Sequence, residues 1–420
     1  MTFSPVETAA VLIVLATVLG YLNYRFIGLP HTIGLTVMGA LASLAVIAID
    51  WVLPTPLDDA ERSLLQSVDF SETLLNGMLS FLLFAGALHV ELSSLLERKW
   101  TVGLLATLGV LVSTVLVALG FKAITWLLGF ELSLFWCLVF GALISPTDPV
   151  AVLGILRSAG TPPAFEAKIA GESLFNDGVG VVVFAILLAA ATGAETFSLA
   201  RAGELFAVEA GGGVVLGLAL GYLGFAVMKT VDEHNIEILI TLSIVMGGYA
   251  LAQRLHVSGP IAMAVAGLLI GNRAVTLAMS ERTREHLLGF WSLLDEILNS
   301  VLFLLIGLEV IAIATGGAHL LAGLLAIPVV LGARAISVAL PLGVIARLRA
   351  FMPGTYPMLV WGGLRGGISI ALALTLPSGE VQALLLTTTY VVVVFSVAVQ
   401  GTTVGLAARR LLRPEPSAVS

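Results

Sequence analysis

Long apolar runs separated by short polar connections occupy almost the whole of this 420-residue chain. A helix needs about 20 apolar residues to cross the hydrocarbon core of a bilayer. Thirteen runs of about that length lie at residues 8–27, 32–53, 73–91, 101–121, 134–157, 166–192, 204–228, 235–253, 257–272, 288–312, 319–346, 355–377 and 381–408. The pattern predicts an all-α polytopic membrane protein with about thirteen transmembrane helices, in one domain covering residues 1–420.

Composition supports the same class. The chain is 58% hydrophobic and 11% charged, with a mean hydropathy of +1.06, whereas soluble domains carry about 25% charged residues. A single cysteine, Cys137, excludes disulfides within the chain, and no Cys/His metal spacing is present. We therefore expect the lipid bilayer as a partner, no nucleic acid and no bound cofactor.

Basic residues predict the orientation in the membrane, because cytoplasmic loops carry an excess of Lys and Arg. The loops after odd-numbered spans and the C-terminal tail hold Arg25, Arg98, Lys99, Arg157, Lys168, Lys229, Arg273, Arg282, Arg284, Arg347, Arg349, Arg409, Arg410 and Arg413. The even-numbered loops hold Arg62, Arg201 and Arg254, and Lys122 at the end of the fourth span can extend to the outer interface. This asymmetry predicts an outside N-terminus and a cytoplasmic C-terminus in the inner (plasma) membrane of the cell.

Two arginines interrupt predicted spans at mid-depth. Arg334 lies in "VVLGARAISVALP" and Arg365 in "WGGLRGGISIALALTLP". A charge at the bilayer centre costs about 2.5–3.5 kcal/mol even on insertion scales, so both need partners within the protein and point to a functional site.

The fifth span contains "GALISPTDPVAVLGIL", where Pro146 and Pro149 flank Thr147 and Asp148. Proline removes a backbone donor and disfavours the helical conformation of the residue before it. This predicts a broken helix, whose free backbone groups and side chains can coordinate ions in a protein-lined cavity. A simple proline kink, with Asp148 bonded to freed amides, is the alternative.

The sixth span carries "GESLFNDGVGVVVF". Ser173 and Asp177 are four residues apart, as are Glu172 and Asn176, so a helix places both pairs on one side. Their oxygens suit a small hard cation, and a carboxylate there can instead hold a proton. A polar contact that only joins helices is the alternative.

The numbers of acidic and basic residues within the predicted spans indicate which groups can bind an ion. Asp148, Glu172, Asp177 and, as a fourth candidate, Glu296 face only two buried cations, Arg334 and Arg365. A carboxylate left without a partner would bind a proton or a metal cation. Competition between H⁺ and Na⁺ for one carboxylate is exchange chemistry. Glu296 shares one helical side with Asn299 and Ser300, which predicts either an ion path or helix packing.

The twelfth span is interrupted by glycines as the fifth is by prolines, and the two lie seven spans apart in the sequence. An odd separation means opposite orientation, which is typical of inverted-repeat transporters with two interrupted crossing helices. We expect a first repeat at about 8–192, a linking helix at about 204–228 and a second repeat at about 235–411. In this arrangement the Asp148 region and Arg365 would neutralise opposing half-helix ends. Close helix packing is the alternative role for the glycines.

These stretches resemble the monovalent cation/proton antiporters of the sodium/proton exchanger type. The resemblance covers nearly the whole chain and lies in "SPTDPVAV", "GESLFNDGVGVVVF", "NSVLFLLIGLEV", "GARAISV" and "WGGLRGGISIALALTLP". It implies thirteen helices in two inverted six-helix units with a linking helix, a homodimer, and alternating-access exchange of Na⁺ for H⁺, with Li⁺ or K⁺ as alternative cations.

Carried over residue by residue, the resemblance implies transported-cation ligands at Thr147, Asp148, Ser173 and Asp177, with Asn176 supporting the site. Asn176-Asp177 would mark one-for-one, electroneutral exchange. A structural ion pair would join Glu172 to Arg334, and Arg365 would lie near the helix crossing. Some archaeal relatives supply a further ligand from a glutamate in the third span, where this chain has Ala85.

Other functions fit the residues less well. A K⁺/H⁺ antiporter of the same fold stays open, because the ligand types suit both cations. A cation channel also needs polar groups at depth, but the chain has no "TVGYG"-type filter. An intramembrane protease could use a pair of aspartates for acid–base chemistry. The motifs contain no Ser/His pair or metal cluster, however, and the two buried arginines can neutralise the acids. We therefore expect a transporter and not an enzyme.

Overall fold

The computed structural model describes residues 5–52, 77–149, 152–154, 156, 161, 163–193, 197–309, 316–346 and 354–411. Parts of the second, third, fifth and tenth predicted spans lie outside these ranges, namely 53, 73–76, 150, 151, 155, 157 and 310–312. The same holds for five residues of the charge asymmetry, Arg62, Arg157, Arg347, Arg349 and Arg413.

Every regular element in the described ranges is helical, as predicted. The α-helices are α1 (Pro5–Leu22), α2 (His31–Val52), α5 (Leu79–Leu88), α6 (Leu92–Glu97), α7 (Lys99–Leu104), α8 (Val110–Leu127), α9 (Leu134–Ile144), α11 (Pro163–Ala191), α12 (Leu199–Met228), α13 (His234–Arg254), α14 (Gly259–Leu269), α15 (Val275–Leu277), α16 (Glu281–Leu308), α17 (Gly317–Ala346), α18 (Thr355–Trp361), α19 (Gly367–Leu374), α20 (Glu380–Phe395) and α21 (Thr402–Leu411). Wider π-helical segments join some of them, at η1 (Asn23–Ile27), η3 (Leu105–Gly109), η4 (Ile270–Ala274) and η6 (Ser396–Gly401).

Nine helical stretches of the described chain are long and apolar enough to cross a membrane. They are Val6–Ile27, His31–Ile49, Lys99–Leu127, Lys168–Ala191, Leu199–Met228, His234–Arg254, Glu281–Leu308, Gly317–Ile345 and Glu380–Leu411. The other four predicted spans fall on the shorter or divided helices α5, α9, α14 and α18–α19. The protein is therefore an all-helical, multi-pass membrane protein in which several apolar spans are interrupted.

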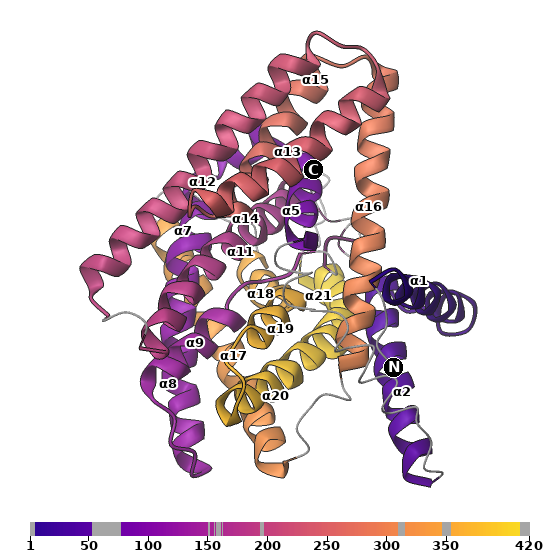
Figure 1. Cartoon of the computed structure of the whole chain (residues 1–420). Coiled ribbons are helices and arrows are strands. Elements are labelled where there is room, and N and C mark those ends of the chain that lie inside the picture. The colour runs from indigo at the N-terminus through magenta and orange to yellow at the C-terminus, as the bar shows by residue number, and fades with distance from the viewer. Residues whose placement is uncertain are drawn as a thin grey trace, which may run out of the picture.

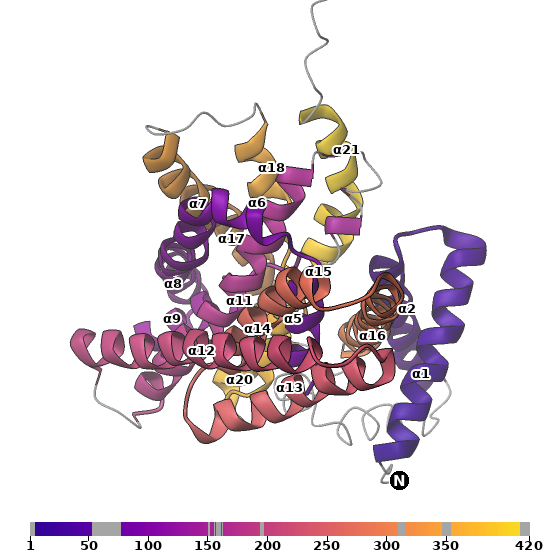
Figure 2. The ribbon, with the colours of Figure 1, turned by 90° about the horizontal axis from the view of Figure 1, so that it is seen from above.

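The helices pack around two main apolar cores. One lies among α8, α9, α17, α19 and α20, and the other among α5, α13 and α14. Helix α16 joins the cores, because Trp291 in its first half belongs to the second core and Phe303 in its second half to the first. In Figure 1, α12 runs diagonally across the molecule, and Figure 2 shows α1 and α2 at the opposite side from α7 and α8.

Two interrupted helices meet inside the first core. Helix α9 ends at Ile144, the chain continues without helix through Pro149, and amides of Val152 and Leu153 then bond the Pro149 carbonyl as helix resumes. The second interruption separates α18 from α19. We call residues 145–149 the proline break and 362–366 the glycine break. The amide of Asp148 donates to the carbonyl of Leu364 over 2.8 Å, so the two breaks are hydrogen-bonded to each other.

Candidate functional site

The proline break places carbonyls at the end of α9, and Arg365 occupies that position. Its Nη1 donates to the carbonyl oxygens of Ser145 and Pro146, the latter over 2.9 Å. The C-terminal end of a helix carries a partial negative charge, so a cation there is favourable. Arg365 is buried and forms no ion pair within the described residues. Its charge is therefore matched by backbone carbonyls of the proline break.

A negatively charged side chain, Asp148, lies at the glycine break. The carboxylate of Asp148 lies directly against Gly366, immediately before α19. A Cβ atom built on Gly366 would come 2.2 Å from Asp148 Oδ2, so no other residue fits without moving the carboxylate. An anion at the N-terminal end of a helix is favourable for the same electrostatic reason. Each break thus presents a charged side chain to the half-helix end of the other.

Three polar side chains form a network beside Asp148. The Thr147 amide donates to Asn176 Oδ1 over 3.3 Å, and Asn176 Nδ2 donates to Thr147 Oγ1 over 2.7 Å. The Thr147 hydroxyl also shares a hydrogen bond of 3.0 Å with Ser173 Oγ. All three side chains are buried. The proline break is therefore fixed to α11 through Asn176 on one side and Ser173 on the other.

Asp177 differs from Glu172 because no ion-pair or hydrogen-bond partner for its side chain is found among the described residues. Its side chain is one helical turn from Ser173 on α11 and is only 4% exposed. Its Oδ1 atom accepts no hydrogen bond from the described residues. Buried polar atoms are nearly always paired, and a buried ionised carboxylate without a partner is costly. The site thus presents an open carboxylate oxygen that a proton or a cation would satisfy.

Glu172, on the same helix, is paired. Arg334 Nη1 lies 2.5 Å from Glu172 Oε1, and Arg334 Nη2 donates to the carbonyl of Leu359 over 3.0 Å. Both charged side chains are buried. Gly363 makes room for Arg334, because a Cβ atom there would lie 2.6 Å from Arg334 Nε. The pair joins α11 to α17 and to the end of α18.

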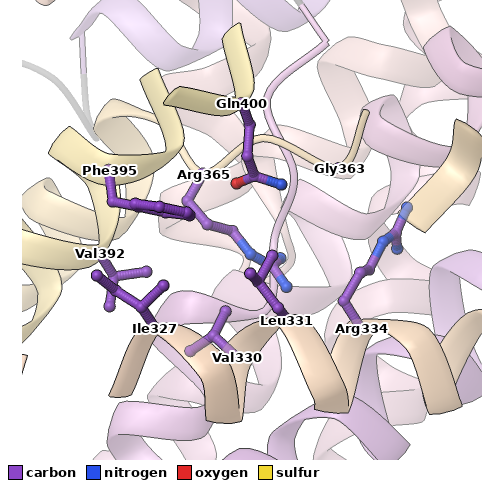
Figure 3. A pocket seen from close by; sticks show the side chains of 9 residues that line it. All are labelled: Ile327, Val330, Leu331, Arg334, Gly363, Arg365, Val392, Phe395 and Gln400. Carbon is purple, nitrogen blue, oxygen red and sulfur yellow. The ribbon is translucent and has the colours of Figure 1, made fainter. Parts of the chain in front are cut away.

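A cavity of about 10 Å³ lies between the two buried arginines. Figure 3 shows Arg334 on α17 and Arg365 in the glycine break on different sides of this space, with Gly363 and Gln400. Its volume is close to that of one water-sized probe. The two arginines therefore line one small cavity, and among the described residues they share no acidic partner.

The charge balance expected from the sequence needs two corrections. Arg365 binds carbonyls and not an acid, so only one of the two arginines pairs with a carboxylate in the described residues. Glu296 is exposed, whereas Asn299 on the same helix is buried. Ser300 bonds to His31 of α2 over 2.9 Å, so it contributes to packing between α16 and α2. Glu296 is therefore not one of the buried acids, and the contact of Ser300 with His31 favours helix packing, one of the two alternatives predicted for this side of α16.

Sequence reasoning missed the residues that support the glycine break. The Arg365 amide donates to Ser396 Oγ over 2.9 Å, and Ser396 donates to Gln400 Oε1 over 2.8 Å. Gln400 in turn donates to the Trp361 carbonyl over 3.1 Å. Ser396 and Gln400 lie in η6, and π-helical turns often occur at functional sites. Ser396 and Gln400, two polar residues four apart in a mainly apolar part of the last span, were the available signal.

Ala85, at the position where a further ligand was considered, is buried in α5. It packs with Phe84 and Leu88 in the second apolar core, and its carbonyl oxygen bonds the His89 ring over 2.8 Å. Its side chain offers no oxygen atom. The oxygen donors of the candidate site therefore come from the proline break and α11.

Comparisons with known proteins agree in family and fold. Residues 13–410 match the family model described as sodium/hydrogen exchanger, transmembrane. The Na(+)/H(+) antiporter NhaP of Pseudomonas aeruginosa is 46% identical over 98% of each chain, and the Na(+)/H(+) antiporter NhaH of Halobacillus dabanensis is 35% identical over 89% of this chain and 90% of its own. A solved structure of the sodium proton antiporter MjNhaP1 from Methanocaldococcus jannaschii at pH 8 has a TM-score of 0.74, covering 96% of this chain and 98% of that one. At 21% identity, that likeness concerns the fold.

Proposed function

The chain belongs to the sodium/hydrogen exchanger family, and from this premise we propose that it exchanges Na⁺ for H⁺ across the membrane by alternating access. The names of the two relatives described above support Na⁺ as the cation. The observation that carries the proposal is the buried Asp177 carboxylate, which has an oxygen without a hydrogen-bond partner among the described residues. One carboxylate that can hold either ion couples the two fluxes.

The proposed cation ligands are Thr147, Asp148, Ser173 and Asp177. Hydroxyl and carboxylate oxygens are suitable for a small hard cation. The shared hydrogen bond between Thr147 and Ser173 keeps two hydroxyls close together, which supports their joint role. Asn176 holds Thr147 from both its amide and its hydroxyl and acts as a positioning residue.

Glu172, Arg334 and Arg365 act structurally in this proposal. The Glu172–Arg334 pair fixes α11 against α17, and Arg365 offsets the carbonyl end of α9. Neither arginine needs to change partner during the cycle. The charge that changes is therefore the charge of the ion bound at Asp177.

The exchange is electroneutral, one Na⁺ for one H⁺. Asn176 stands next to Asp177 where a second carboxylate would titrate, and an amide cannot do so. Asp148 remains an anion at the start of α19, where the helix end favours negative charge. If Asp177 carries either ion alone, the loaded protein has the same charge in both directions, and the membrane potential does no work on the cycle.

The proposed architecture has thirteen spans, with repeats at about 8–192 and 235–411 in opposite orientation and a linking helix at about 204–228. The paired breaks, one in each repeat, support this division. The N-terminus is outside, the C-terminus is cytoplasmic, and the protein works as a homodimer in the inner (plasma) membrane. The excess of basic residues in one set of loops supports that orientation.

Proteoliposomes test this function. Purified protein is reconstituted with a pH indicator inside, and Na⁺, Li⁺ or K⁺ is added separately outside in a choline-based buffer without ionophore. The Na⁺ experiment is then repeated with valinomycin and fixed K⁺ concentrations that clamp the voltage at 0 or about ±100 mV. We expect saturable, Na⁺-dependent proton efflux whose rate and end point do not move with voltage. A cation conductance without proton movement would overturn antiport. Exchange with K⁺ alone would overturn Na⁺ selectivity, and a steady shift with voltage would implicate Asp148 as a second proton carrier.

A further inference from the structure

An apolar groove of about 410 Å³ lies between α12 and its neighbours, away from the candidate ion site. We call it the α12 groove, and its walls include Leu95 of α6, Phe175 of α11, Leu218 and Phe225 of α12 and Leu268 of α14. Figure 1 shows α12 lying beside α14 and α11. The volume falls within the range of about 300–1,000 Å³ typical of pockets that bind small molecules.

The groove has a defined depth in the membrane. Phe175 lies directly before Asn176 and Asp177 on α11, so the inner end of the groove is level with the ion site. Arg273 lies at the other end, eight residues after Val265 along α14 and η4, which corresponds to about 12 Å of helix. Half of a bilayer's hydrocarbon core is about 15 Å thick. The groove therefore extends through one leaflet.

Arg273 is the one charged residue among the described residues that line the groove. It is exposed, and it forms no hydrogen bond or ion pair within the described part of the chain. The acidic residue nearest in sequence to Leu92, at the same end, is Glu91, whose carboxylate accepts hydrogen bonds from Ser93 and Ser94 over 2.7 and 2.8 Å. An apolar groove thus ends at a guanidinium group for which the described part of the chain supplies no acidic partner.

The segment that carries Arg273 is held in place. Arg273 lies in the π-helical η4, and the neighbouring Asn272 bonds to the connection between α5 and α6. Asn272 Oδ1 accepts from the Leu92 amide over 2.7 Å, and Asn272 Nδ2 donates to the Val90 carbonyl over 2.9 Å. These contacts keep Leu92 and Arg273 together at the mouth of the groove, which is therefore built into the fold.

We propose that the α12 groove binds one anionic phospholipid, with an acyl chain between α11, α12 and α14 and the phosphate at Arg273. A chain running through one leaflet matches the length of the groove, and a basic pocket between transmembrane helices is a suitable site for anionic headgroups. In the orientation proposed above, the lipid belongs to the cytoplasmic leaflet. Arg273 selects the headgroup, and the apolar walls hold the chain.

Native mass spectrometry of the full-length protein in detergent tests the site, with phosphatidylglycerol and phosphatidylcholine of identical acyl chains as probes. We expect phosphatidylglycerol to bind more tightly. Arg273→Gln should weaken phosphatidylglycerol binding about tenfold, to the level of phosphatidylcholine, because one charge-assisted contact is lost. The control Arg284→Gln removes an exposed cation in the first turn of α16, which does not line the groove, and should bind like the wild type.

A second pair of variants tests the chain-binding part. Leu218→Trp fills the groove and should weaken binding of both lipids, whereas Val215→Trp adds the same ring to an exposed position of α12 outside the lining. Equal binding of both lipids, or equal effects of Arg273→Gln and Arg284→Gln, would overturn the proposal. It is also wrong if Leu218→Trp leaves lipid binding unchanged but abolishes dimers, because a second copy would then cover the groove. If millimolar inorganic phosphate displaced phosphatidylglycerol, the groove would bind phosphate and not a lipid.

Discussion

Glu172 and Asp177 are two acidic residues on one helix, five positions apart, and both are almost fully buried. Glu172 is 2.5 Å from Arg334, whereas Asp177 has a carboxylate oxygen that no described residue satisfies. Two acidic residues that are equally buried on one helix thus have opposite environments. A paired carboxylate keeps its charge and stabilises the helix contact, and an unpaired one needs a small ion. We therefore expect Glu172 to contribute to stability and Asp177 to contribute to ion exchange.

The largest expected effect is the loss of transport when the unpaired carboxylate of Asp177 is replaced. Asp177→Asn should abolish Na⁺-driven proton flux in proteoliposomes, a loss of at least about 100-fold, because an amide can bind neither ion competitively. Thermal stability should be maintained or increased, since the substitution removes a buried charge without breaking an ion pair. Wild-type flux, or a collapse of the melting temperature with loss of inserted protein, would contradict the assignment.

Substitutions in the Glu172–Arg334 pair should mainly lower the stability of the protein. Glu172→Ala and Arg334→Ala each leave an uncompensated buried charge, which costs about 3–5 kcal/mol of folding free energy. Both variants should express poorly and melt early in detergent. The double variant Glu172→Ala/Arg334→Ala should recover part of this loss, because neither charge is then left alone. If the double variant melts no later than the worse single variant, the two residues are not energetically coupled.

A smaller effect is expected where Asp148 meets the glycine break. Gly366→Ala places a methyl group where Asp148 Oδ2 now lies, so the carboxylate must move away from the start of α19. We expect the Na⁺ concentration for half-maximal flux to rise about tenfold, the effect of losing one contact to a charged group. Gly332→Ala in α17 is the control, since a Cβ atom there would meet no atom within 4 Å. Equal transport by both variants would argue against Asp148 as a ligand.

The smallest expected effect is a shift in pH dependence. Protons exclude Na⁺ from Asp177 at low pH, and too few protons are available for the return step at high pH, so the rate should have a maximum. Because the ions compete, each tenfold increase in Na⁺ should move the acidic midpoint down by about one pH unit. An acidic midpoint that stays fixed as Na⁺ is varied from millimolar to molar would instead indicate a separate regulatory group.

The transmembrane helices were predictable from the long apolar runs, whereas the contacts between side chains of distant segments were not. Pro146 and Pro149 predicted the proline break, because proline acts on its own backbone. The hydrogen bond from Asp148 to Leu364 and the carbonyl partners of Arg365 depend on segments more than 200 residues apart, and no local pattern specifies such pairing. The exposure of Glu296 was not predictable, because residues four apart share a side of the helix but periodicity alone cannot say which side faces the core.

Proton release on Na⁺ binding tests most directly whether the two ions compete for Asp177. Purified protein is kept in weakly buffered detergent solution on the acidic side of the transport maximum, and the pH is followed as NaCl is added, with choline chloride as the salt control. Binding of a metal cation to a protonated ligand releases its proton. If the two ions compete for Asp177, the wild type and Gly332→Ala should each release about one H⁺ per protomer, and Asp177→Asn should release none. Equal proton release by Asp177→Asn and the wild type would contradict that competition.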